Sequence, residues 1–214
     1  MKPVIISVLL LSFLLSIAAA LNCYHCHKRN SDTCEHEEKK CPEGDQCITI
    51  SEEYKNNGTF RSIFKGCSRD LPCEKEPYGK VNNDVYLLIS TKCCDKDLCN
   101  SEFYEMPEDD EPNGVICPSC YEENTAEECK GDHEIMCRGK DDKCLTFSGD
   151  VKKPDGNMVT YSCKGCISTL ACQLELSQMI GVQVLDEKIF TCVDNPPKPP
   201  GEEENDKEKI NLLP

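Results

Sequence analysis

A pair of closely spaced cysteines followed by a histidine is the first feature of this sequence that could do chemistry. The segment Cys23-Tyr24-His25-Cys26-His27 has the pattern by which c-type cytochromes attach haem, with two cysteines for thioether bonds and an axial histidine. The two cysteines recur as Cys117 and Cys120, but Tyr121 and Glu122 follow them and the histidine is missing. Haem attachment would break this shared repeat, so we expect no haem.

The histidines and acidic residues do not form a recognisable site either. The four histidines, His25, His27, His36 and His133, have no spacing typical of a metal site. No Ser, His and Asp set has the local sequence of a known triad, and abundant acidic residues more often form a solvated surface than an acid/base pair. We therefore predict no catalytic, cofactor-binding or metal-binding residues, and a protein that is not an enzyme.

The N-terminus indicates the compartment in which the cysteines act. Lys2, the apolar run Val4–Ile17 and three alanines ending at Ala20 have the order of a cleavable signal peptide. We predict that the mature chain begins near Leu21 and is secreted to the extracellular space, where thiols oxidise to disulfides. No later segment is apolar enough to cross a bilayer, and residues 208–214 lack the apolar tail that precedes a lipid anchor. We expect no membrane anchor.

Composition indicates what holds the chain together and which partners it excludes. The 214 residues include 19 cysteines but no Trp and only six Phe, so disulfides must supply much of the stability, roughly 2–4 kcal/mol each. The formal net charge is −15, and loss of Lys2 with the signal peptide makes it −16. This charge argues against nucleic acid or anionic lipid as partner and favours a basic protein.

One pattern of cysteine spacings occurs twice in the chain, and we call it the cysteine ladder. Both copies begin with a three-residue step, contain a Lys-Gly-Cys sequence, and continue with steps of six and twenty residues. The first copy is Cys23, Cys26, Cys34, Cys41, Cys47, Cys67, Cys73, Cys93, Cys94 and Cys99; the second is Cys117, Cys120, Cys129, Cys137, Cys144, Cys166, Cys172 and Cys192.

The ladder divides the chain into five parts. We predict a signal peptide over 1–20, a first domain over 21–100, an exposed acidic linker over 101–114, a second domain over 115–193 and a disordered tail rich in proline and acidic residues over 194–214. Residues 47–54 and 60–67 flank an Asn-Gly pair, and 144–151 and 158–166 flank a loop with Asp-Gly, which predicts one long β-hairpin in each domain. Their bases must be pinned together, because such hairpins do not stand alone in water.

The two ends of the first copy resemble a known family. The opening Leu21-Asn22-Cys23-Tyr24-His25-Cys26 and the closing Cys93-Cys94-Asp95-Lys96-Asp97-Leu98-Cys99-Asn100 are similar to those of the lymphocyte-antigen and urokinase-receptor domain, or three-finger fold. The resemblance covers 21–100 and 115 to about 193. It implies an all-β fold with two disulfide-rich three-finger domains in tandem.

The resemblance also implies the disulfide pairing, which the sequence alone does not fix. In the first domain it pairs Cys23 with Cys47, Cys26 with Cys34, Cys41 with Cys67, Cys73 with Cys93, and Cys94 with Cys99. In the second it pairs Cys117 with Cys144, Cys120 with Cys129, Cys137 with Cys166, and Cys172 with Cys192, without the closing pair and Asn. Cys163, which aligns with Phe64, has no family partner. It is either a buried thiol on a strand, a bridge to another chain, or a cysteine that exchanges pairing with Cys166.

A ten-cysteine domain followed by one without its closing loop is similar to the gamma-type phospholipase A(2) inhibitors, and also to the sodefrin-precursor-like courtship factors. The first resemblance implies inhibition of a secreted phospholipase A(2), in agreement with the acidic charge; the second implies a secreted signal that acts on a receptor. Inhibitors of this type are often multimeric, so a homo-oligomer is one expected state. Phospholipases themselves carry a histidine where this chain has Asp97, and no glycine-rich calcium loop accompanies it.

One sequence motif predicts a modification at a fingertip. Asn57-Gly58-Thr59 is an N-glycosylation acceptor in the turn of the first long hairpin. A glycan there would screen the middle finger of the first domain. We therefore expect recognition through the second domain or the sheet faces between the domains, with the loop 152–157 as a candidate contact.

Overall fold

The computed structural model describes residues 20–69, 71, 73, 75–104, 111–174 and 179–194. The predicted signal peptide up to residue 19, residues 105–110 of the predicted linker and the predicted tail from residue 195 lie outside the described residues. Among those described, no helix has the length and apolar character needed to span a membrane. Apart from one short helix the described chain is built of β-strands, which confirms the predicted all-β class.

The described residues of the first domain form six strands. They are β1 (Asn22–Lys28), β2 (Glu37–Lys40), β3 (Cys47–Asn56), β4 (Thr59–Cys67), β5 (Tyr78–Asn82) and β6 (Val85–Cys94). The long hairpin predicted around Asn57 is β3–β4, with Asn57 and Gly58 at positive φ in its turn. Gly58 adopts φ +148°, a conformation that favours a residue without a Cβ.

The part of the second domain that the structure describes has five strands and the helix. They are β7 (Pro112–Glu123), β8 (His133–Arg138), β9 (Lys143–Lys152), β10 (Met158–Ile167), α2 (Thr169–Cys172) and β11 (Gln183–Val193). The predicted second hairpin is β9–β10, paired from Met158 opposite Lys152 to Ile167 opposite Lys143. Strand β11 pairs with β9 through a ladder interrupted by two bulges.

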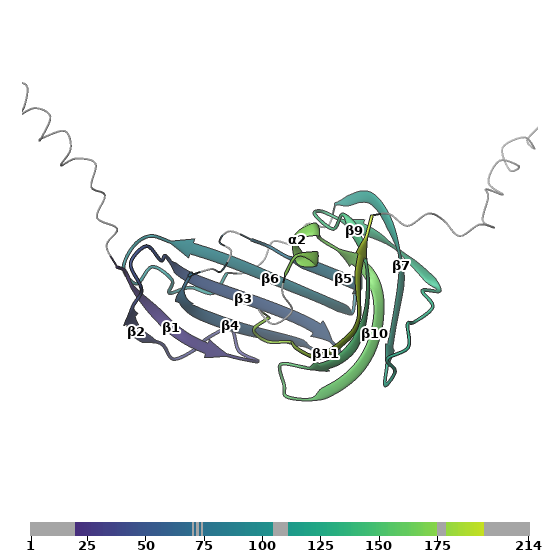
Figure 1. Cartoon of the computed structure of the whole chain (residues 1–214), viewed down its shortest axis with the longest axis horizontal. Coiled ribbons are helices and arrows are strands. Elements are labelled where there is room, and N and C mark those ends of the chain that lie inside the picture. The colour runs from purple at the N-terminus through teal and green to yellow at the C-terminus, as the bar shows by residue number, and fades with distance from the viewer. Residues whose placement is uncertain are drawn as a thin grey trace, which may run out of the picture.

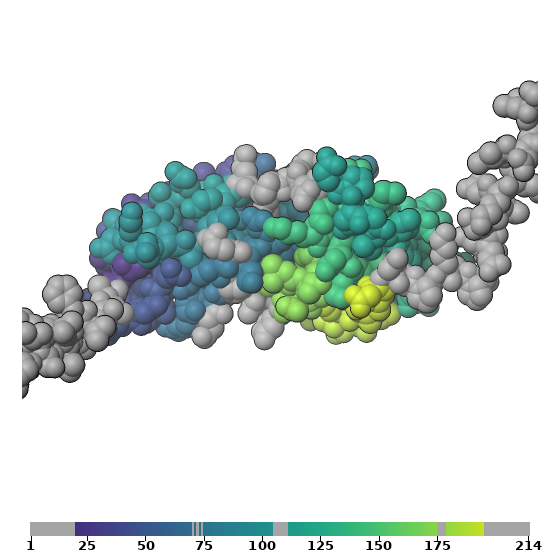
Figure 2. Space-filling view, turned by 90° about the horizontal axis from the view of Figure 1, so that it is seen from above, coloured from purple at the N-terminus to yellow at the C-terminus, as the bar shows by residue number. Residues whose placement is uncertain are grey.

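One continuous sheet joins the two domains, a connection that the sequence did not predict. The strand order is β11-β9-β10-β5-β6-β3-β4-β1-β2, with β7 paired to β10 and β8 to β7 (Figure 1). The junction is the pairing of β10 with β5, where Cys166 lies opposite Lys80 and Ile167 opposite Gly79. In the space-filling view the two domains form one elongated body with the described N- and C-terminal residues at opposite ends (Figure 2).

The second domain begins inside the segment that the sequence predicted as linker. Strand β7 starts at Pro112, which pairs with Arg138. The amide of Asn113 donates hydrogen bonds to the carbonyl oxygens of Gly139 and Asp141, 3.1 and 2.9 Å away. The pairing of β7 with β8 shifts register between Pro112 and Ile116. The side chain of Asn113 thus extends the domain toward the N-terminus, because it satisfies two carbonyls of the neighbouring loop.

The largest apolar cluster lies between the domains. It combines Tyr54 and Val81 of the first domain with four residues of the second, Phe147, Val151, Cys163 and Val182. A second cluster packs Ile48, Ile50 and Ile89 of the first domain against Ile180 of the second. Full burial of a valine or isoleucine side chain contributes ~1.5–3 kcal/mol. Separation of the two domains would therefore expose much of the apolar core of the molecule.

Candidate functional site

Nine disulfides secure the roots of the fingers. In the first domain they join Cys23–Cys47, Cys26–Cys34, Cys41–Cys67, Cys73–Cys93 and Cys94–Cys99. In the second domain they join Cys117–Cys144, Cys120–Cys129, Cys137–Cys166 and Cys172–Cys192. Six of these bonds join residues 20 to 29 positions apart in sequence, and the other three close short loops. The loops between the strands remain free to vary in sequence.

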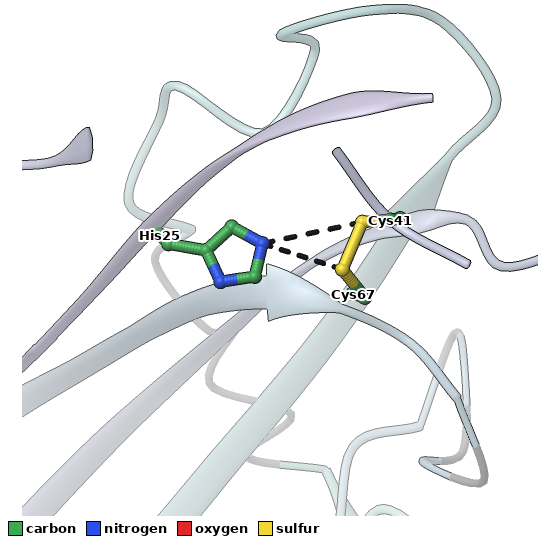
Figure 3. A group of neighbouring side chains, drawn as sticks. All are labelled: His25, Cys41 and Cys67. Carbon is green, nitrogen blue, oxygen red and sulfur yellow. Dashed lines mark hydrogen bonds between the residues drawn. A yellow bond between two sulfur atoms is a disulfide. The ribbon is translucent and has the colours of Figure 1, made fainter. Parts of the chain in front are cut away.

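Two clusters of potential metal ligands lie among these disulfides. In the first, Nε2 of His25 lies 3.3 Å from Sγ of Cys67 and 4.0 Å from Sγ of Cys41, as Figure 3 shows. The second consists of Cys117, Cys137 and Cys166. The sulfur atoms of both clusters are already in disulfides, so neither cluster offers a metal the thiolates that it would need.

Cys26 of the haem-like segment is likewise bonded, to Cys34, and Cys23 to Cys47. His25 and His27 lie on β1 with different surroundings. Partial burial, and then the nearby Lys39 ammonium, lower the pKa of His25, which favours its neutral form against the disulfide. His27 lies 3.1 Å from the carbonyl oxygen of Ile180 in the second domain. The segment therefore serves the fold and the contact between the domains.

Cys163 is the one cysteine without a disulfide among the described residues, and it lies in the core between the domains. Only 4% of its surface is exposed. On β10 it stands opposite Phe147 of β9 and Tyr121 of β7. Burial raises the pKa of its thiol to about 12, so the reactive thiolate is absent at neutral pH. Of the three alternatives for this cysteine, the low exposure favours the buried thiol.

Glu52 on β3 makes a buried polar contact between the domains. Only 1% of the surface of Glu52 is exposed. Its carboxylate accepts hydrogen bonds from three successive backbone N–H groups of the second domain, those of Ile180, Gly181 and Val182, at 2.9, 3.1 and 2.7 Å. Burial raises the pKa of Glu52, while the three N–H donors and the charge of Arg29 act in the opposite direction. The loop 180–182 thus wraps a carboxylate that is deeply buried in the first domain.

Arg29 and a close glycine contact complete this junction. The side chain of Arg29 donates a 3.0 Å hydrogen bond to the carbonyl oxygen of Ile180, so the loop is held on both its N–H and its C=O groups. A Cβ on Gly181 would lie 2.6 Å from Oε1 of Glu52. Only a residue without a side chain allows the backbone to approach the carboxylate this closely.

A second set of contacts lies beside the β10–β5 pairing. Ser119 donates a 2.7 Å hydrogen bond to the carbonyl oxygen of Val81, and the amide of Asn56 donates to the hydroxyl of Tyr121. The backbone N–H of Ser168 donates to the carbonyl oxygen of Tyr78 at 2.9 Å. These hydrogen bonds connect β3 and β5 of the first domain with β7 and the N-cap of α2 in the second, and they fix the relative orientation of the domains.

The exposed fingertips are candidate contact surfaces for a partner. Asn57, the predicted glycosylation site, is exposed in the β3–β4 turn. In the second domain the β9–β10 loop of residues 152–157 ends at Met158, whose side chain is 77% exposed. Leu185 on the edge strand β11 is 53% exposed. Single exposed apolar side chains are common on protein surfaces, so Met158 is a candidate because it stands at a fingertip, whereas Leu185 lies along a strand.

Sequence reasoning missed the residues that join the domains. Glu52 lies in a hairpin strand next to Glu53, and charged residues of this kind are usually exposed. The loop 180–182 carries no motif. One available signal was Gly165, because a glycine inside a strand marks a close backbone approach, here to the backbone of Lys80 and Val81.

Comparison with known proteins divides the chain into the same two domains. The family profile of the u-PAR/Ly-6 domain matches residues 19–102 and again 113–195. A gamma-type phospholipase A2 inhibitor chain of Laticauda semifasciata is 31% identical over 153 residues, 69% of this chain and 81% of that protein. Phospholipase A2 inhibitor NAI of Notechis ater is 29% identical over 163 residues, 75% of this chain and 80% of that protein.

Two further likenesses cover most of both chains. The 31 kDa phospholipase A2 inhibitor chain of Naja kaouthia is 29% identical over 186 residues, 85% of this chain and 96% of that protein. Among solved structures, mouse TEX101 matches 80% of this chain and 97% of its own, at 18% identity and a TM-score of 0.34. Because the family profile matches both halves of the chain, this protein belongs to the u-PAR/Ly-6 domain family, with two copies of the domain.

Proposed function

We propose that this protein is secreted and acts outside the cell as a stoichiometric inhibitor that binds a secreted phospholipase A2 and has no enzyme activity of its own. The observation that carries the proposal is the similarity to phospholipase A2 inhibitors across both domains, over 69–85% of the chain. The domain pair is the matched unit, so the shared binding function belongs to both domains together.

The contact between the domains supports a surface that both domains contribute to. The shared sheet, the buried Glu52 and the apolar core hold the fingers in fixed relative positions. A pre-organised surface binds more tightly than a flexible one, because less conformational freedom is lost on association. We therefore expect recognition by the intact domain pair and not by either domain alone.

Within this surface we assign the central contact to the second domain, at the loop 152–157 and Met158. Met158 is the most exposed of the large apolar side chains in the described residues, and burial of such a side chain at the centre of an interface contributes strongly to affinity. The corresponding tip of the first domain carries Asn57, where we propose a glycan. A glycan at that position would keep a partner away from the β3–β4 turn.

Charge supports fast capture of a basic enzyme. The formal net charge of −15 attracts a positively charged partner over long range, and such steering raises the association rate while salt lowers it. We expect the association rate constant to fall about tenfold or more between low and high salt, with a smaller change in the dissociation rate. A salt-independent association rate would contradict the role of charge but not the inhibition itself.

The decisive experiment is a titration of the purified, glycosylated mature protein against a panel of secreted phospholipases A2, with substrate hydrolysis and complex formation followed in parallel. Saturable inhibition that is lost when the disulfides are reduced supports the proposal. Absence of both binding and inhibition across acidic and basic enzymes contradicts it and favours the secreted signal that acts on a receptor.

A matched pair of variants tests the assigned surface. Met158→Ser removes the exposed side chain beside the fingertip loop, and Leu185→Ser removes a similar apolar side chain from β11. We expect Met158→Ser to weaken inhibition about tenfold or more and Leu185→Ser to leave it nearly unchanged. Asn57→Gln, which removes the glycan acceptor, should leave inhibition intact. A strong gain in affinity for Asn57→Gln with no effect of Met158→Ser would place the contact on the first domain instead.

A further inference from the structure

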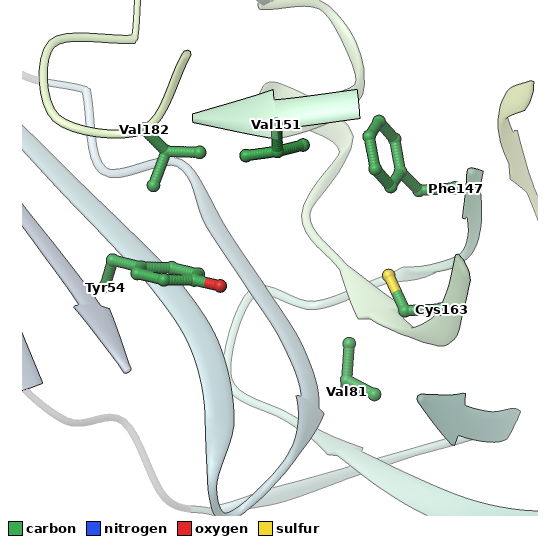
Figure 4. Packing of buried hydrophobic residues seen from close by; sticks show 6 residues of the cluster. All are labelled: Tyr54, Val81, Phe147, Val151, Cys163 and Val182. Atoms are coloured by element: carbon green, nitrogen blue, oxygen red, sulfur yellow. The ribbon is translucent and has the colours of Figure 1, made fainter. Parts of the chain in front are cut away.

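A cavity lies where the two domains meet, and none of the proposed inhibition depends on it. Its volume is about 110 Å³, and it is partly open to solvent. The first domain contributes Tyr54, Val81 and Leu87 to its wall, and the second domain contributes Phe147, Cys163 and Val182. Most of these residues belong to the cluster of Figure 4, in which six side chains from both domains surround a common space.

The chemistry of the wall restricts what could enter. Of the described residues that line the cavity, none is charged, and nearly all of its surface is aliphatic or aromatic carbon. An isolated carboxylate or ammonium placed there would lose its hydration without gaining a partner, which is strongly unfavourable. Water is held poorly by such a wall, because an ordered water needs several polar partners, and apolar molecules are accepted instead. The ligand class that fits is therefore uncharged and mostly hydrocarbon.

The shape and size of the cavity further restrict which ligands fit. A fully apolar cavity of about 150 Å³ accepts benzene, whereas this one has about 110 Å³ and an opening. A narrow aliphatic chain that enters through the open side fits this space better than a ring. Binding sites for small molecules typically combine such an apolar wall with a few polar groups that fix the orientation of the ligand.

Tyr161 supplies a polar group of this kind. Its ring lies in the wall of the cavity and contacts the rings of Tyr121 and Phe147, with centroids 5.3 and 5.2 Å away. Among the described residues, none accepts a hydrogen bond from its hydroxyl, whereas the hydroxyls of Tyr121 and Tyr86 donate to glutamates. The hydroxyl of Tyr161 is therefore free to donate a hydrogen bond to water or to the polar oxygen of a ligand.

We propose that this interdomain cavity is a binding site for the alkyl chain of an uncharged single-chain amphiphile, with the Tyr161 hydroxyl donating a hydrogen bond to its polar oxygen. Because both domains form the wall, such a ligand contacts β3, β5 and β6 on one side and β9, β10 and the loop 180–182 on the other. Occupation stabilises the paired arrangement of the domains, since a ligand that binds only the folded state raises its stability by mass action.

The test uses the full mature protein and two probes of equal chain length, 1-octanol and octanoate at pH 7. Thermal unfolding and methyl NMR are followed as each probe is added. We expect 1-octanol to raise the melting temperature with saturation and to shift the methyl signals of Val81 and Val182. The methyls of Val115 and Ile135, which pack in the disulfide cluster of the second domain, should not move. Octanoate should bind at least about tenfold more weakly.

Two substitutions at one position separate the cavity from other sites. Cys163→Phe fills the space and should weaken 1-octanol binding about tenfold or more, whereas Cys163→Ala removes only the sulfur and should preserve it. The NMR comparison on the unmodified protein stands even where Cys163→Phe does not fold. The proposal is overturned by an absence of saturation, by equal binding of octanoate, by shifts spread equally over Val115 and Ile135, or by a folded Cys163→Phe that binds as well as Cys163→Ala.

Discussion

The third fingers of the two domains differ in a way that explains how the domains are joined. In the first domain the finger is a complete hairpin, β5–β6. In the second domain the described residues of this finger form only one strand, β11, preceded by α2 and the loop that includes residues 180–182. Strand β5 pairs with β10 of the second domain, and the loop 180–182 binds Glu52 of the first. Each domain therefore uses its third finger to complete the other domain.

The difference shows why the pair behaves as one structural unit. In a chain of independent domains, each third finger would close its own sheet. Here the hydrogen bonds that β5 would offer to solvent are used by the second domain, and the buried carboxylate of Glu52 is satisfied by a loop that follows it by more than 120 residues. Loss of either contact would expose unpaired polar groups.

The largest expected effect comes from removal of the carboxylate that the second domain wraps. Glu52→Ala leaves three buried N–H groups without an acceptor, each at a cost of roughly 1–3 kcal/mol, so we expect a loss of at least about 3 kcal/mol in the free energy of unfolding. The measurement is urea unfolding with the disulfides intact. The matched control is Glu53→Ala, whose carboxylate accepts hydrogen bonds from the side chains of Arg61 and Tyr86 and leaves no backbone N–H unpaired, so the loss should be about 1–2 kcal/mol. Equal losses for the two variants would argue against a special role of Glu52.

The two glycines of the Lys-Gly-Cys repeat give the next comparison. A Cβ on Gly165 would meet the carbonyl of Lys80 and lie 2.6 Å from Cα of Val81, both backbone atoms of the other domain. A Cβ on Gly66 would lie 2.9 Å from the ring of Phe64, which can rotate. We expect Gly165→Ala to lower the free energy of unfolding by about 1–3 kcal/mol and Gly66→Ala by under about 1 kcal/mol.

The readout for the glycine pair is thermal unfolding together with hydrogen exchange of the amides in β5 and β10. Loss of protection at Lys80 in Gly165→Ala, with normal protection in Gly66→Ala, is the expected pattern. Greater destabilisation by Gly66→Ala would show that the close approach of β10 to β5 contributes little.

An effect of similar size, confined to one domain, follows from the closing segment that only the first domain has. Asn100 accepts a hydrogen bond from the N–H of Tyr24 and donates to the carbonyl oxygens of Tyr24 and Ile48, all at 3.0 Å. Asn100→Ala should cost about 1–3 kcal/mol and remove hydrogen-exchange protection at Tyr24. Amides of β9 in the second domain should keep theirs. Equal loss of protection in both domains would mean that this contact stabilises the whole pair.

The smallest expected effect is the pH dependence that Glu52 contributes. Burial raises the pKa of Glu52 in the folded protein, so its contribution is fully present below the unfolded pKa of about 4.3 and is lost as the pH rises through the raised value. Glu52→Gln does not titrate. The stability of the unmodified protein relative to Glu52→Gln should therefore be highest near pH 4 and decrease toward neutral pH. A difference that is constant or grows with pH would contradict the direction of the shift.

The sequence was a good guide wherever the decisive contacts are local. The Asn-Gly pair and the flanking β-branched and aromatic residues predicted the β3–β4 hairpin within a few residues of its ends, and the β9–β10 hairpin was predicted in the same way. Turn geometry and side-chain alternation are properties of neighbouring residues, so they are visible in the sequence. The start of β7 was missed because the side chain of Asn113 bonds to a loop more than 20 residues later.

By itself the sequence determined the strand-rich, disulfide-bonded character of the chain and its division into two copies of one domain, because cysteine spacing and hairpin patterns record these features directly. Only the tertiary structure decided that β5 pairs with β10, that Glu52 is buried under the loop 180–182, and that Cys163 lines a space shared by both domains. The physical reason is that strand edges pair through backbone groups, which are the same for nearly every residue type. The burial of a charge likewise depends on the distant N–H groups that reach it, and not on its sequence neighbours.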